Sequence, residues 1–140
     1  MPHKYIINIM NLEVYARIKD FDNYAVSNFG NVINIKTGRK LKPATINGYL
    51  RVILSGKKHL IHRLVACQYL QKIENKNLVD HIDGCKTNNY LNNLRFCNAS
   101  ENMRNSKPSS KNTSGVKGLT YDKKRNKWQA QIMFNNCSRS

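Results

Sequence analysis

The sequence predicts an α+β fold in which a small antiparallel β module precedes a strand–strand–helix segment and a basic β-hairpin tail. Residues 21–60 contain short runs of β-branched and aromatic residues separated by Gly-marked turns, which is typical of a small sheet. The apolar run at 61–70 is too long for the usual strand and suits one buried helix. Residues 78–106 then read as strand, loop, strand and helix.

The first predicted module spans residues 1–60. Residues 24–26 and 32–35 are strand-like and flank a turn at 27–30. An Asn-Gly pair leads into a longer strand at 49–54, which a Gly-containing turn closes. We therefore expect an antiparallel sheet here.

The second predicted module spans residues 61–106. A strand at 78–82 ends in an Asp-Gly turn, and an Asn-rich loop leads to a second strand at 94–97. Asn98 suits a helix N-cap, and Glu101 follows three residues later as in a capping box. This helix follows the second strand directly.

The last part of the chain is a Ser/Pro/Lys linker at 107–112 and a basic tail at 113–140. Two strands are expected in the tail, at 115–121 and 128–134, joined by the basic turn 122–127. A two-stranded hairpin without a packing partner is marginally stable in water.

Charge is unevenly distributed along the chain, whose net charge is +16. Residues 1–60 and 107–140 each carry a net charge of +7, whereas residues 61–106 carry +2 and hold half of the acidic residues. Such a surplus indicates a polyanionic partner, with nucleic acid favoured over an acidic membrane. No apolar run reaches membrane-spanning length and residues 1–10 lack signal-peptide features, so we expect a soluble, intracellular protein that is not secreted.

The four cysteines are Cys67, Cys85, Cys97 and Cys137. A structural zinc site normally takes its ligands in close pairs, and these residues form no such pair. We therefore expect free thiols, some of them buried, and no structural zinc.

The stretch LVDHIDGCKTNNYLNNLRFCNASENMRN, with IHRLVACQYL upstream, resembles the HNH nuclease family and in particular the homing endonucleases of phage and viral genomes. The match consists of the Asp80-His81 pair, the Asp-Gly turn after it, Asn93-Leu94-Arg95 and Glu101-Asn102, in order and at family spacing. It covers residues 20–106. The resemblance implies a ββα-metal core and an endonuclease that hydrolyses phosphodiester bonds in double-stranded DNA.

Within this resemblance His81 is the expected general base, because a histidine can accept a proton from water at neutral pH. Asp80 and Asn102 offer oxygen ligands for one Mg²⁺ or Mn²⁺ ion. Asn93, assigned to the catalytic group with His81, resembles the family residue that fixes the loop between the strands. Asp83 could be a second carboxylate at the site, but a turn residue is favoured. His62 could cap the helix or touch DNA, and no catalytic role is expected for it.

Basic residues on both sides of the core are expected to hold DNA through its phosphates. Residues 20–60 resemble the β-rich module that often precedes the HNH core, and SGVKGLTYDKKRNKWQAQIMF resembles the opening strands of an APETALA-type DNA-binding domain. The backing helix of that domain is missing, so the tail is either truncated or ordered only on DNA. The predicted nucleic-acid-binding residues are Lys40, Lys42, Arg51, Lys57, Lys58, Arg63, Arg95, Arg104, Lys123, Lys124, Arg125 and Lys127.

Two other function classes remain open from the sequence. One is a catalytically decayed DNA-binding protein derived from such a nuclease, and the other is a basic RNA-binding protein, although the scattered aromatic residues give no stacking pattern. For the nuclease we expect a monomer or a weak dimer on DNA, one nick per active site, and no protein or membrane partner.

Overall fold

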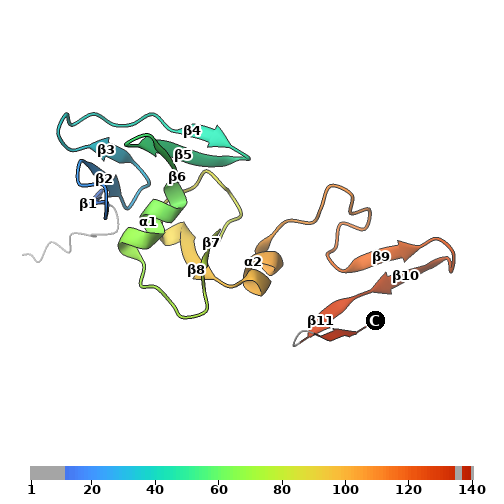
Figure 1. Ribbon diagram of the computed structural model, residues 1–140. Helices are drawn as coiled ribbons and strands as arrows, with labels where there is room; N and C mark the ends of the chain where they lie inside the picture. The colour runs from blue at the N-terminus through green and yellow to red at the C-terminus, as the bar shows by residue number, and fades with distance from the viewer. Residues whose placement is uncertain (1–11, 135–136, 140) are drawn as a thin grey trace, which may run out of the picture. The chain divides into compact units, whose positions relative to one another are not determined.

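The structure is a computed structural model that describes residues 12–134 and 137–139, and it divides into two compact units, Met1–Asn105 and Ser106–Ser140 (Figure 1). The elements of the first unit are β1 (Tyr15–Arg17), β2 (Tyr24–Ser27), β3 (Val32–Asn34), β4 (Ala44–Ile46), β5 (Tyr49–Leu54), β6 (Lys57–Leu60), α1 (Ile61–Tyr69), β7 (Leu78–His81), the 3-10 turn η2 (Leu91–Asn93), β8 (Leu94–Cys97) and α2 (Ala99–Asn105).

The predicted β module consists of two antiparallel sheets, β1-β2-β3 and β4-β5-β6. Gly30 makes the turn between β2 and β3 with a φ of 84°, and Asn47 and Gly48 make the β4–β5 hairpin with φ values of 49° and 82°. Positive φ at both central residues is what a tight hairpin requires. The sequence did not predict β1, β4 and β6 as separate strands, because they are short and β4 is exposed throughout, without the apolar alternation that marks a half-buried strand.

Helix α1 is the element around which the first unit packs. It contacts β2, β5 and β6 on the side of the β module, and β7, β8 and η2 on the side of the later strands. The Tyr69 hydroxyl donates to the Val26 carbonyl at 2.7 Å, which ties the end of the helix to β2. The buried apolar cluster around the helix comprises Ile18, Val26, Val32, Val52, Leu54, Ile61, Val65 and Leu94. Because this cluster draws on both predicted modules, the first unit has one common core.

Strands β7 and β8 form an antiparallel pair, and α2 follows β8 after one residue. The predicted capping box is present: the Glu101 amide donates to Asn98 Oδ1 at 2.9 Å, and the Asn98 amide donates to Glu101 Oε2 at 3.0 Å. This reciprocal cap fixes where α2 begins relative to β8.

The second unit contains two hairpins, β9 (Leu119–Asp122) with β10 (Lys127–Ala130) and β11 (Ile132–Phe134) with β12 (Cys137–Arg139). The predicted strand at 128–134 is interrupted at Gln131. The Tyr121 and Trp128 rings meet edge to face at 5.0 Å, and Trp128 is 54% exposed, so this pair is not part of a closed core. Neither helix in the described part of the chain is long and apolar enough to cross a membrane.

Candidate active site

Asp80 and His81 lie side by side at the end of β7, and both are buried. Cross-strand pairing places Asp80 opposite Arg95 and His81 opposite Leu94. Arg95 donates to Asp80 Oδ2 through Nη2 at 2.8 Å and Nε at 3.2 Å. The Asn105 side chain on α2 also donates to Asp80 Oδ2, at 2.9 Å. A buried carboxylate needs such compensation, and here it comes from one cation and one amide.

The His81 ring is held in one orientation by Asn89. The His81 Nε2 atom lies 3.0 Å from Asn89 Oδ1, and both residues are buried. Because an amide oxygen only accepts hydrogen bonds, this contact is a hydrogen bond in the tautomer that carries the proton on Nε2. In the neutral ring Nδ1 is then left with its lone pair, which is the atom that can accept a proton.

Two aromatic side chains border the His81 ring. His62, in the first turn of α1, meets it edge to face at 4.9 Å between centroids, and Tyr49, on β5, lies 5.9 Å away. Burial lowers the pKa of His62 to about 4, with further contributions from the nearby His81 and Arg63. His62 is therefore uncharged at neutral pH. Its Nδ1 is buried without a hydrogen-bond partner among the described residues.

The loop between β7 and β8 is closed by Asn93 and Asp83. Asn93 Nδ2 donates to Asp83 Oδ1 at 2.8 Å and to the Asn88 carbonyl at 2.9 Å, and its Oδ1 accepts from the Asp83 amide at 3.1 Å. Asp83 also accepts from the Asn88 side chain and the Cys85 amide, and these hydrogen bonds hold the pKa of its carboxyl below the ordinary value. These contacts favour the turn role for Asp83. Asn93 orders the loop that carries Asn89, and no described hydrogen bond joins it to His81 itself.

Sequence reasoning did not select Asn89 and Asn105, which make the direct contacts to His81 and Asp80. Asn105 Nδ2 also donates to the His81 carbonyl at 2.8 Å, so it braces both residues at once. Asn102, the predicted metal ligand, is exposed one turn earlier on the same face of α2. The three-residue spacing of Asn102 and Asn105 was the available signal for Asn105. Nothing in the sequence separated Asn89 from its neighbours in the Asn-rich loop.

The donor set fits a hard divalent ion that also binds substrate. The described residues contain no group of three His, Cys, Asp or Glu side chains that could hold a metal. Mg²⁺ in nucleases is commonly held by one or two carboxylates together with water and substrate phosphate. Asp80 supplies one carboxylate, and Asn102 on α2 carries an exposed amide, so these predicted ligands are of the oxygen type that a hard ion prefers.

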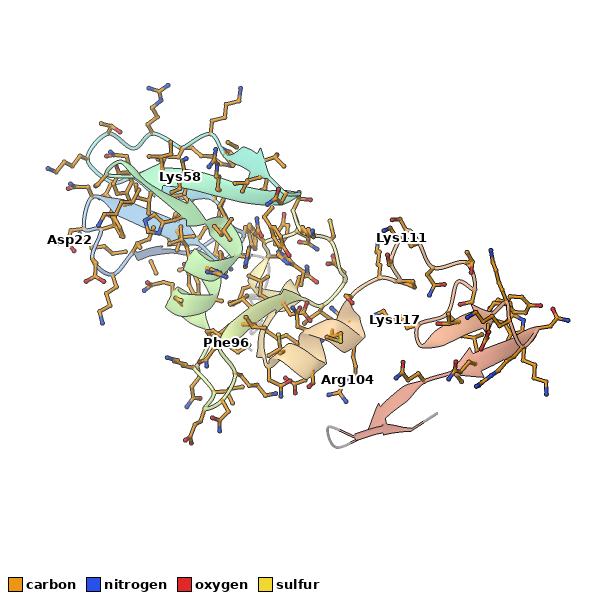
Figure 2. The ribbon with its side chains drawn as sticks, turned by 45° about the vertical axis from the view of Figure 1, so that its right-hand side comes forward. Asp22, Lys58, Phe96, Arg104, Lys111 and Lys117 are labelled. Atoms are coloured by element: carbon orange, nitrogen blue, oxygen red, sulfur yellow. The ribbon has the colours of Figure 1, made fainter. Side chains whose placement is uncertain are left out.

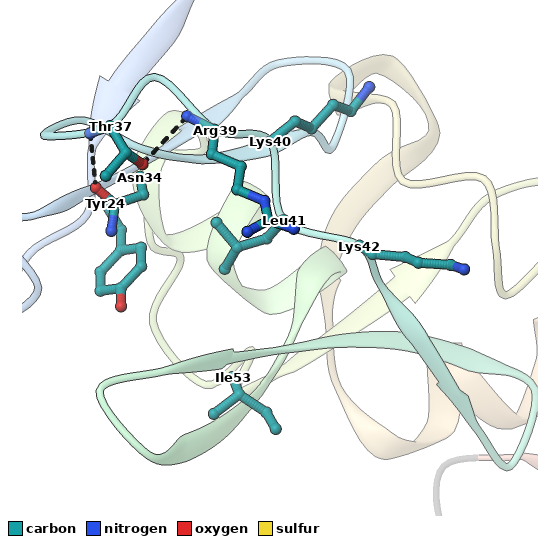
Figure 3. A pocket seen from close by; sticks show the side chains of 8 residues that line it. All are labelled: Tyr24, Asn34, Thr37, Arg39, Lys40, Leu41, Lys42 and Ile53. Atoms are coloured by element: carbon teal, nitrogen blue, oxygen red, sulfur yellow. Dashed lines mark hydrogen bonds between the residues drawn. The ribbon is translucent and has the colours of Figure 1, made fainter.

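The predicted DNA-binding residues are exposed, except for Arg51, which is half-buried. In the β module, Arg39, Lys40 and Lys42 line a pocket of about 660 Å³, together with Tyr24 and other residues (Figure 3). Lys58, on β6, is labelled in Figure 2.

A second, polar pocket of about 340 Å³ includes Arg95 and Asn105, the two residues that donate hydrogen bonds to Asp80. It is lined by Arg95, Glu101, Arg104 and Asn105. Arg95 and Arg104 were both predicted to bind DNA. In the structure Arg95 forms an ion pair with Asp80.

Comparisons with known proteins match two segments of the chain. The NUMOD4 motif matches residues 13–55, and the HNH endonuclease family matches residues 59–104. An HNH endonuclease of Acanthamoeba polyphaga mimivirus is 43% identical over 62% of this chain and 24% of that protein. The DNA endonuclease I-HmuI of Bacillus phage SP01 is 40% identical over 63% of this chain and 54% of that protein.

A solved structure that concerns DNA binding and cleavage by the HNH homing endonuclease I-HmuI matches this chain with a TM-score of 0.58 and 37% sequence identity. It covers 66% of this chain and 56% of that chain, so this chain spans about half of I-HmuI and a quarter of the mimivirus protein. The matches confirm the predicted resemblance and fold class. The tail at 113–140 lies beyond both matched segments, and its APETALA-type resemblance stays a prediction. The chain therefore contains a segment, residues 59–104, that matches the HNH endonuclease family, and a NUMOD4 motif at residues 13–55 precedes it.

Proposed function

We propose that the chain is a divalent-metal-dependent DNA endonuclease that hydrolyses one phosphodiester bond per active site and therefore nicks DNA. The observation that carries the proposal is the hydrogen bond from His81 Nε2 to Asn89, which leaves Nδ1 as a proton acceptor. Basic, exposed residues in the β module and in the tail support DNA as the substrate, since they suit a phosphate backbone.

In this proposal His81 Nδ1 takes the proton from a water molecule as that water attacks the phosphorus. Asn89 keeps the ring in the tautomer that does this, and Asn105 holds the strand end through the His81 carbonyl. Asp80 and Asn102 would hold the metal ion, with Asn105 positioning the Asp80 carboxylate. When bound, a Mg²⁺ or Mn²⁺ ion would polarise the phosphate and stabilise the leaving oxygen.

Cleavage of supercoiled plasmid tests the proposal, with Mg²⁺, Mn²⁺ or EDTA, for the wild type and the His81→Ala variant. We expect metal-dependent nicking, a loss of about 10²- to 10⁴-fold in rate for His81→Ala, and nearly unchanged DNA affinity. His59→Ala is the matched histidine control, because His59 packs edge to face against Phe21 and makes no described contact with Asp80 or His81.

Nicking by His81→Ala at the wild-type rate would remove His81 as the base. DNA binding without cleavage under any metal would instead indicate the decayed DNA-binding protein, and a preference for RNA that does not depend on His81 would indicate the RNA-binding alternative.

A further inference from the structure

The β module reaches the residue that orients His81. Gly30, in the β2–β3 turn, has a φ of 84°, and a Cβ placed on it would lie 2.7 Å from the Cβ of Asn89 and 3.2 Å from the Asn89 carbonyl oxygen. A separation under 3.0 Å is too short for two carbon atoms, so only glycine lets the turn and Asn89 come this close. The backbone of the turn is therefore in contact with the residue that holds the His81 ring.

Neighbouring contacts keep the same turn against the same part of the loop. The Leu91 amide donates to the Asn28 carbonyl at 2.8 Å, and the Phe29 and Tyr90 rings lie 5.0 Å apart. Three successive residues of the turn thus contact three successive loop residues. These contacts hold the loop backbone from Asn89 to Leu91 against the turn.

A second contact links the β module to the other end of the loop. Lys86 Nζ lies 4.7 Å from the centre of the Tyr49 ring and donates to the Asn47 carbonyl at 3.2 Å. Tyr49 also contacts the rings of His62 and His81. The β4–β5 hairpin therefore touches the loop and the His81 ring together.

We propose that the β module, besides any contact with DNA, is a positioning element of the active site: the turn Asn28–Gly30 seats Asn89, and the seated Asn89 fixes His81 as its Nε2–H tautomer. Tyr49 and Lys86 hold the same loop from its other end. The inference rests on the proposed function for its kinetic consequence, whereas the tautomer of His81 is a property of the protein without DNA.

The test compares Gly30→Ala with Gly56→Ala in the full chain. Gly56 has a nearly equal φ of 81°, but a Cβ there meets nothing within 4 Å, so the pair separates the contact with Asn89 from backbone strain. Nitrogen-15 NMR of the histidine rings reports the tautomer, and single-turnover cleavage with measured DNA affinity reports the reaction. We expect Gly30→Ala to lose the dominant Nε2–H form of His81 and about tenfold or more in the rate of cleavage of bound DNA. DNA affinity should stay within about twofold, and Gly56→Ala should behave as the wild type.

The double variant Gly30→Ala with Asn89→Ala adds a second criterion. If Gly30 acts through Asn89, adding Gly30→Ala to Asn89→Ala lowers the cleavage rate little further. If Gly30→Ala instead disturbs the structure in general, the losses in rate of the two substitutions add. If Gly30→Ala does not fold, Lys86→Ala is compared with Lys72→Ala, a substitution at an exposed lysine. The same NMR and cleavage measurements are made, and only Lys86→Ala is expected to lose the Nε2–H form of His81 and cleavage rate.

An unchanged His81 tautomer in folded Gly30→Ala, or an equal change in Gly56→Ala, would overturn the inference. Failure of the proposed function gives a different result, because the wild type itself would then not cleave DNA. The NMR comparison of the His81 tautomer in Gly30→Ala and Gly56→Ala does not depend on cleavage. A tautomer change specific to Gly30→Ala supports the positioning role in that case too.

Discussion

His62 is a buried histidine whose charge state is set by its surroundings. Burial lowers its pKa to about 4, and the nearby His81 and Arg63 add to that effect. In the unfolded chain the same ring has an ordinary pKa near 6.5. Between these two values the unfolded state binds a proton that the folded state excludes, so the contribution of His62 to stability falls as the pH is lowered through this window.

We therefore predict that His62→Phe reduces the loss of folding stability between about pH 6.5 and pH 4. The measurement is urea unfolding at intervals across this range for the wild type and the variant, with pH 8 as the reference, where His62 is neutral in both states. Parallel stability curves for the two proteins would show that His62 titrates normally in the folded chain.

The residue scale is also where prediction from sequence was least complete. The resemblance to HNH nucleases singled out Asp80 and His81 as candidates, and the structure places both at the end of β7, while their catalytic roles stay predictions. Asn89 and Asn105 were missed. An asparagine that hydrogen-bonds to a site residue cannot be distinguished in the sequence from one that only ends a turn. Only the fold shows which amide reaches which atom.

At the scale of single elements, helix α2 depends on its N-terminal cap for stability. It has seven residues and none of its side chains is fully buried, so packing contributes little to its stability. The capping box and the Lys76–Glu101 ion pair at 2.7 Å hold its first turn. The helix in turn carries Asn105 to Asp80.

We predict that Asn98→Ala lowers the free energy of unfolding by about 1 kcal/mol, because the helix loses its N-cap. The variant should also cleave more slowly, since Asn105 is then held less firmly. Ser100→Ala, in the same turn and exposed, is the control and should be close to wild type in both respects. Chemical denaturation and single-turnover cleavage measure the two effects, and equal values for the two variants would contradict the role of the cap.

Elements with strong local signals were predicted well. Helix α1, strands β2, β5, β7 and β8, and the start of α2 all carry apolar runs or cap residues that act over a few positions. Strand β4 lacked such a signal, since its hydrogen bonds to β5 depend on a hairpin rather than on its own exposed side chains. Local propensity does not reveal a strand whose only support is its partner.

At the scale of the whole molecule, the predicted boundary at residue 60 separates segments that share one core. Helix α1 starts at Ile61 and contacts strands from both sides of that position. Long-range packing of this kind has no signature in a single sequence. The second unit, Ser106–Ser140, contains the segment for which a basic tail was predicted.

The tail offers a test of how the chain holds DNA. Removing residues 107–140 should weaken DNA binding and make it less dependent on salt. If the basic residues of the β9–β10 turn contact phosphates, four contacts would change the slope of log affinity against log salt by about 3 to 4. A full-length variant with Lys123, Lys124, Arg125 and Lys127 changed to Gln separates charge from the rest of the tail. Identical salt slopes for all three proteins would exclude the tail from the DNA interface.

The pairing of Arg95 and Asn105 with Asp80 has a consequence for how this protein survives changes in its surroundings. The buried carboxylate already has a counter-charge and an amide donor from its own chain, so the fold does not wait for an ion to neutralise it. Small zinc-dependent domains, by contrast, unfold when their metal is withdrawn. If Asp80 holds a metal ion as proposed, loss of that ion would stop cleavage and leave the scaffold intact, because Arg95 and Asn105 already stabilise the carboxylate. Arg95 is therefore expected to keep the Asp80 carboxylate paired, and the fold stable, whether or not the proposed metal ion is bound.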